Sequence, residues 1–163
     1  MTSYDQLTTW LNSAYAMEKS MVQVLENHAK DAKELPEVRQ RDEQHLEETR
    51  RHAQQIERCL ELLNEKPSKT KTAMGNIMGL VQGASTGMYR DELVKNFLSD
   101  YAAEQFEIAS YRSLIAAAEE LGKPEIARIC EGILEEEEAM AEWLIERIPG
   151  ITRMTLQQQH AHA

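Results

Sequence analysis

The chain has 163 residues, a formal net charge of -10 from 28 acidic and 18 basic side chains, and 42% hydrophobic residues. This composition predicts a single globular domain with a buried core and excludes a disordered chain. The negative charge argues against non-specific binding to nucleic acid or to an anionic membrane surface. No apolar stretch reaches the ~20 residues of a membrane span, and no signal peptide is visible, so we expect a cytoplasmic protein.

Proline positions divide the chain into four predicted helices. Prolines stand at 36, 67, 124 and 149, and the stretches between them are rich in Glu, Ala, Leu, Gln, Lys and Met, which favour helix. No stretch alternates with the period of a strand. Pro36 and Pro124 suit the first turn of a helix, where the missing N–H costs nothing. The sequence predicts an all-α fold with helices over residues 3–33, 36–64, 89–121 and 124–147.

Connection lengths predict how these helices are joined. A few residues link the first helix to the second and the third to the fourth, so each pair is expected to form an antiparallel hairpin. About 24 residues separate the hairpins, enough to cross the length of a bundle, and this connectivity is that of ferritin-like four-helix bundles. We expect residues 1–149 to form the bundle and residues 150–163 a C-terminal tail.

The predicted crossover contains glycines at a period of four. If it is helical, the glycines form one bare stripe that another backbone can approach, and the alternative is an irregular linker that needs positive φ. The glycines are Gly75, Gly79, Gly83 and Gly87.

Glutamates occupy core-facing positions near the middle of the helices. Glu18 interrupts the apolar stripe of the first helix, Glu104 interrupts that of the third, and Glu107 lies about one turn further on. Glutamate is almost never fully buried unless it is paired or bound to metal. No Lys or Arg lies at the centre of these stripes, whereas two divalent cations would neutralise four carboxylates. Carboxylates with one or two imidazoles favour Fe or Mn over Zn.

The second and fourth helices contribute further candidates. Glu48 flanks the apolar centre of the second helix, and His45 and His52 lie on that centre within reach of it. Either histidine could instead be a hydrogen-bonded core residue. On the fourth helix the stripe angle favours Glu137. An internal repeat, in which residues 46–48 are echoed by 134–136, favours Glu136, so the sequence leaves this choice open.

Tyrosines and cysteines near these positions have simpler interpretations. Tyr15, Tyr101 and Tyr111 lie close to the carboxylates, where they either donate hydrogen bonds or only pack. Cys59 and Cys130 are interpreted as small core residues.

Four segments together resemble the YciE/YciF family of bacterial ferritin-like stress proteins. They are AMEK at 16–19, EQHLEETR at 43–50, EQFEIASY at 104–111 and MAEWLIERIP at 140–149. The resemblance covers nearly the whole chain, and it implies a ferritin-like bundle with an extra crossover helix and a homodimer. His52 departs from the family, in which Gln is expected, and the second Glu-x-x-His of ferritins is missing from the fourth helix. The metal ligands that the resemblance implies are Glu18, His45, Glu48, Glu104, Glu107 and Glu136.

These observations favour a metal-containing oxidoreductase. In this hypothesis two Fe or Mn ions per chain react with peroxide or O2 in the bundle core during stress. The alternatives are a non-catalytic metal-binding dimer and a structural helical bundle without metal.

Overall fold

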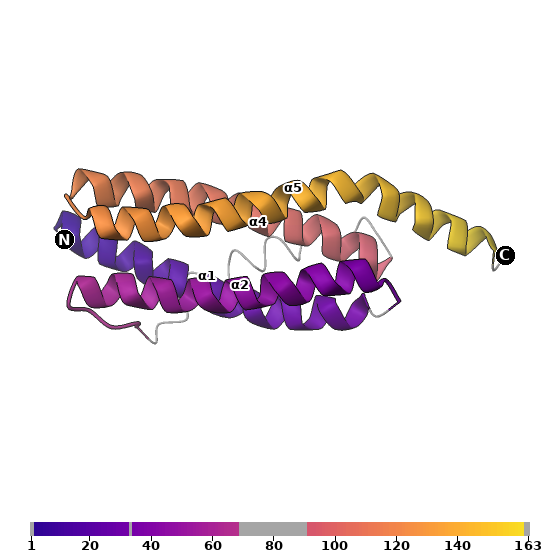
Figure 1. Ribbon diagram of the computed structural model, residues 1–163, viewed down its shortest axis with the longest axis horizontal. Coiled ribbons are helices and arrows are strands. Elements are labelled where there is room, and N and C mark those ends of the chain that lie inside the picture. Colours follow the sequence, from indigo (N-terminus) through magenta and orange to yellow (C-terminus); the bar gives the residue numbers. More distant parts are fainter. Residues whose placement is uncertain (1, 33, 69–90, 162–163) are drawn as a thin grey trace.

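The computed structural model describes residues 2–32, 34–68 and 91–161, and all of its long elements are helices (Figure 1). The helices are α1 (Ser3–Asp31), α2 (Pro36–Leu62), α4 (Glu92–Glu120) and α5 (Pro124–Ala161). The expected crossover segment, with Gly75, Gly79, Gly83 and Gly87, lies outside the described residues.

Local signals account for the helix ends. Thr2 caps α1 through a capping box with Asp5, and Asp91 caps α4 by accepting a hydrogen bond from the backbone N–H of Val94. Pro36 opens α2 at its first turn. Gly122 follows α4 with φ of 64°, a conformation that glycine adopts without strain, and the chain then turns directly into α5.

The helices pack as two antiparallel hairpins, α1 with α2 and α4 with α5. The hairpins meet where α1 packs on α4 and α2 packs on α5. Figure 1 shows that α2 and α4 run in the same direction, so the end of α2 and the start of α4 lie at opposite ends of the bundle. This arrangement confirms the ferritin-like four-helix prediction.

The fourth helix is longer than predicted. It was expected to end at residue 147, but α5 has 38 residues and continues to Ala161 with Pro149 inside it. Proline removes one backbone hydrogen bond within a helix. Ile148 and Ile151, on either side of it, pack against a cluster that contains Met140 and Leu144, and this packing offsets the loss. The end of α5 projects beyond the other three helices (Figure 1).

Apolar clusters fill the bundle on both sides of a polar middle. The larger cluster contains Leu7, Leu11, Ile56 and Ile133, and two smaller clusters occupy the part of the bundle toward the α1–α2 turn. Buried charged side chains therefore lie between two apolar blocks, where water is excluded. Within the described part of the chain, no helix has the length and apolar character required to cross a membrane.

Candidate metal centre

Two groups of buried side chains could each hold a metal ion, and they share one glutamate. The first group is Glu18, His52 and Glu137, and the second is His45, Glu104 and Glu137. Within each group the ligand atoms lie within 4.8 Å of one another. All five residues are at most 1% exposed. Because Glu137 has two carboxylate oxygens, it can serve one ion with each, so the arrangement suits a pair of ions bridged by Glu137.

His45 lies between two kinds of carboxylate. The inner carboxylates are those of the two ligand groups and of Glu107 beside them, and the outer carboxylates, here that of Glu48, lie outside the groups. His45 Nε2 lies 3.0 Å from Glu104 Oε1 and 3.6 Å from Glu137 Oε2, and its Nδ1 lies 2.9 Å from Glu48 Oε2. Arg41 donates to the same oxygen of Glu48 at 3.2 Å. Glu48 therefore sets the orientation of His45 and leaves Nε2 to face the centre, as outer carboxylates do for metal-binding histidines.

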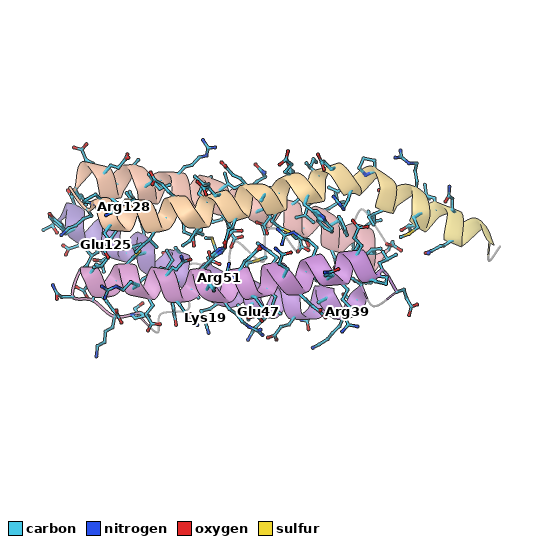
Figure 2. All side chains as sticks on the ribbon, in the orientation of Figure 1. Lys19, Arg39, Glu47, Arg51, Glu125 and Arg128 are labelled. Carbon is cyan, nitrogen blue, oxygen red and sulfur yellow. The ribbon has the colours of Figure 1, made fainter. Side chains whose placement is uncertain are left out.

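His52 repeats this arrangement with its ring nitrogens exchanged. Its Nδ1 lies 2.8 Å from Glu137 Oε1 and 3.7 Å from Glu18 Oε2, and its Nε2 lies 2.6 Å from Glu136 Oε2. Arg51 contacts Glu136 at 3.0 Å and 3.2 Å. Each histidine thus has an inner nitrogen at Glu137 and an outer nitrogen at a carboxylate that an arginine pairs. Arg51 lies near the middle of the bundle, and Arg128 lies near one end (Figure 2).

Each inner carboxylate has a buried oxygen that lacks a hydrogen-bond partner among the described residues. These oxygens are Glu18 Oε2, Glu104 Oε2, Glu107 Oε1 and Glu137 Oε2. The second oxygens of Glu18 and Glu104 contact Tyr111 and His45, and Glu137 Oε1 lies 2.8 Å from His52 Nδ1. Glu107 is 2% exposed, and the charges of Glu137, Glu18 and Glu104 act on it. Unpaired buried carboxylates are costly, and a cation is the usual remedy. Four inner carboxylates also match the charge of two divalent ions, so the residues present fit a pair of such metals.

Without a cation the centre retains protons. Burial, followed by the charge of Glu104, raises the pKa of Glu137 from 4.5 to about 7. Burial likewise raises the pKa of Glu18, and burial together with the charge of Glu137 raises that of Glu107. Burial alone would lower the pKa of His52, but Glu137 and Glu18 beside it raise that pKa to about 10. A divalent ion entering the centre would replace these protons.

Outside the inner groups, ion pairing keeps Glu48 charged. Burial opposes ionisation, but His45 and Arg41 lower the pKa of Glu48 to about 2. Glu48 is therefore an anion at any physiological pH and a strong acceptor for the Nδ1–H of His45.

Tyr111 supplies the one tyrosine contact to the centre that the structure describes. Its side chain is fully buried, and its hydroxyl donates to Glu18 Oε1. The other oxygen of Glu18 is left facing His52. Tyr15 and Tyr101 pack instead in the apolar clusters on either side. Of the two roles considered for these tyrosines, Tyr111 therefore has the donor role.

A second buried polar cluster lies next to the centre, and the sequence analysis missed it. Asp42 and Asp100 are 4% and 3% exposed, and His28 Nδ1 lies 2.8 Å from Asp100 Oδ1. Burial, then the charge of Asp100, raises the pKa of Asp42 from 3.8 to about 7. The helical period offered a signal, because Asp42 precedes His45 by three residues and Asp100 precedes Glu104 by four.

The structure brings most of the predicted residues together and rearranges their roles. Glu18, His45 and Glu104 belong to the two ligand groups, and Glu107 lies beside them. His52 and Glu137, the secondary candidates, also belong to these groups. Glu48 and Glu136 lie outside them and contact the outer nitrogens of the histidines. α5 is rotated so that Glu137 is fully buried, as its stripe angle predicted, whereas the Glu136 side chain, which the repeat favoured, is 39% exposed and contacts His52 from outside the groups.

Comparison with known proteins supports this architecture. Residues 2–157 match the DUF892 family, a domain of unknown function. YciF of Escherichia coli is 32% identical over 137 residues, which span 79% of this chain and 80% of YciF. The crystal structure of YciF, a stress protein, aligns with a TM-score of 0.80 at 25% identity over 94% of this chain and 98% of YciF.

Two further structures have the same fold. A protein from Xanthomonas campestris is 39% identical, with a TM-score of 0.83 over 98% of this chain and 99% of that chain. A bacterioferritin from Desulfovibrio desulfuricans, which has a diiron site, is 20% identical, with a TM-score of 0.75 over 94% of this chain and 85% of that chain. The second likeness concerns the fold alone.

Proposed function

The chain belongs to the DUF892 family and is homologous to YciF, and on that premise we propose that its core binds two Fe or Mn ions and reduces peroxide or O2. The observation that carries the proposal is the pair of buried ligand groups that share Glu137. The charge of four inner carboxylates, and oxygens without hydrogen-bond partners among the described residues, support two divalent ions. Imidazole and carboxylate donors suit Fe and Mn.

When bound, such ions would supply electrons and polarise an oxidant. The chain itself provides the surroundings. Glu137, with a pKa of about 7, can hold a proton on its carboxylate in the metal-free protein and would lose it to solvent when a cation binds. The Tyr111 hydroxyl fixes one oxygen of Glu18, and Arg41 and Arg51 hold the outer carboxylates that orient the histidines. Apolar clusters on both sides keep bulk water from the centre.

We propose four further properties for this protein. It resembles YciE within the family, forms a homodimer, acts in the stress response and is located in the cytoplasm. The alternative function is a metal-binding protein without turnover, and the shifted ligand pattern favours it in one respect. The second Glu-x-x-His of ferritins is absent from the sequence of α5, and the histidine beside Glu137 is His52 of α2.

Metal content and peroxide consumption test the proposal together. Wild type, the double variant Glu18→Ala/Glu104→Ala and the exposed control Glu135→Ala are purified without chelator, and part of each is loaded anaerobically with Fe(II) or Mn(II). We expect near two ions per chain in wild type and control, loss of both in the double variant, and peroxide consumption that follows metal content. Metal without peroxide consumption would establish the alternative. Metal in none of the proteins after loading would leave a structural bundle.

A further inference from the structure

Two cysteines meet in the apolar core between α2 and α5. Cys59 and Cys130 are both 0% exposed and free, and they belong to the same apolar cluster. The register of α2 against α5, in which His52 Nδ1 lies 2.8 Å from Glu137 Oε1, places Cys59 opposite Cys130 across the helix interface. A disulfide, whose S–S bond is about 2.05 Å, would form if the two facing sulfurs approached each other within this cluster.

The pair is aligned with the candidate metal centre. Cys59 follows His52 by seven residues on α2, and Cys130 precedes Glu137 by seven on α5. Since the two helices are antiparallel, both steps lead toward the same end of the bundle. Seven residues are two helical turns, which is roughly 10 Å at 1.5 Å per residue. Electrons cross such a distance readily through a packed protein interior.

Apolar side chains fill the space between. Ile56 lies between His52 and Cys59, and Ile133 lies between Cys130 and Glu137, and both are 0% exposed. The neighbouring Cys59 thiol, and then burial, raise the pKa of Cys130, so Cys130 stays a thiol and is a poor nucleophile. A dissolved oxidant therefore has no path to these two buried sulfurs, and Cys130 offers it no thiolate to attack.

We propose that the Cys59–Cys130 pair is an internal two-electron reductant for the metal centre. The inference rests on the function proposed above, with hydrogen peroxide as the oxidant. The two thiols give up two electrons and two protons and form one S–S bond. The O–O bond of peroxide breaks, takes up two electrons and two protons, and yields two water molecules. The pair supplies within the chain the two electrons that reduction of one peroxide requires.

Thiol state after exposure to peroxide tests this directly. Wild type, Cys130→Ser and Cys59→Ala are loaded with Fe(II), and their metal content is measured to show that the centre is intact. Each receives three equivalents of hydrogen peroxide per chain. This is more than the one equivalent that two Fe(II) ions reduce when each loses one electron. After denaturation and alkylation, peptides are mapped without reduction by mass spectrometry. Remaining peroxide is measured in the same samples.

The expected result is a Cys59–Cys130 disulfide in metal-loaded wild type, with thiols retained in the metal-free protein. Both single variants should consume about one peroxide per chain fewer than wild type does. Peroxide consumption with both cysteines still thiols, and equal in the variants, would overturn this inference and leave the proposed function standing. Equally fast disulfide formation without metal would overturn it too, because the pair would then react with the oxidant directly. No consumption by loaded wild type would remove the proposed function and this inference with it.

Discussion

Replacing Glu137 by Gln should raise the stability of the metal-free protein and abolish metal binding. Glu137 is the residue shared by both ligand groups, and glutamine keeps its shape but carries no charge. In the folded metal-free protein its pKa is about 7, against 4.5 in the unfolded chain. A folded pKa that is raised for an acid means that stability is highest at low pH and is lost as pH rises through that window.

The magnitude follows from these two values. A rise from 4.5 to about 7, at about 1.4 kcal/mol for each pH unit, costs about 3 kcal/mol once the carboxylate is ionised at pH 8. Glu137→Gln removes that cost, so the metal-free variant should be more stable than metal-free wild type by about this amount at pH 8. At pH 4, where the carboxyl is protonated in both states, the difference should largely vanish. The variant should also bind neither ion.

Urea denaturation with chelator at pH 4 and pH 8, together with metal analysis, measures both effects. Glu135→Gln is the matched control, since Glu135 lies two residues before Glu137 on α5 and is exposed, and Glu136→Gln is measured beside it. The control should keep its metal and change stability by less than about 1 kcal/mol. A metal-free Glu137→Gln protein that is less stable than wild type at pH 8 would refute the reasoning. Metal loss in Glu136→Gln with retention in Glu137→Gln would instead identify Glu136 as the ligand.

Three other substitutions test separate parts of the structure. The free energy of unfolding of metal-free wild type should fall between pH 4 and 7 as Asp42 ionises. Asp42→Asn should reduce the slope of this fall by up to about 1.4 kcal/mol per pH unit. An unchanged dependence of the urea midpoint on pH would contradict the raised pKa of Asp42. Tyr111→Phe should destabilise the metal-free protein by about 1.5–3 kcal/mol at neutral pH, because Glu18 loses a hydrogen-bond donor, and should leave the metal content unchanged. A smaller loss of stability in urea denaturation would contradict the hydrogen bond from Tyr111 to Glu18. Pro149→Ala should raise the free energy of unfolding by up to about 3 kcal/mol, as it restores a helical N–H, and a decrease would show that proline is favoured there.

The helices of the described residues, the faces they bury and their pairing into two hairpins followed from the sequence. The apolar stripes place Leu7, Leu11, Glu18 and Leu25 on one face of α1, and all four are 0% exposed. The period of 3.6 residues makes this prediction possible, because it depends on bonds within one helix and not on its neighbours. The end of α5 could not be predicted in this way. Packing of Ile148 and Ile151 carries the helix past Pro149, which by itself would end it.

The division of roles within the centre depended on the tertiary structure. Glu136 and Glu137 are adjacent and differ by ~100° around α5, so both border the apolar stripe. The docking of α5 against α2 and α4 turns Glu137 inward and leaves Glu136 beside Arg51. Periodicity placed His45 and His52 in the core, but most of the carboxylates that they contact lie on α1, α4 and α5, and only Glu48 lies on α2 with them. A sequence determines which face of a helix is buried; the rotation and separation of packed helices determine which atoms meet there.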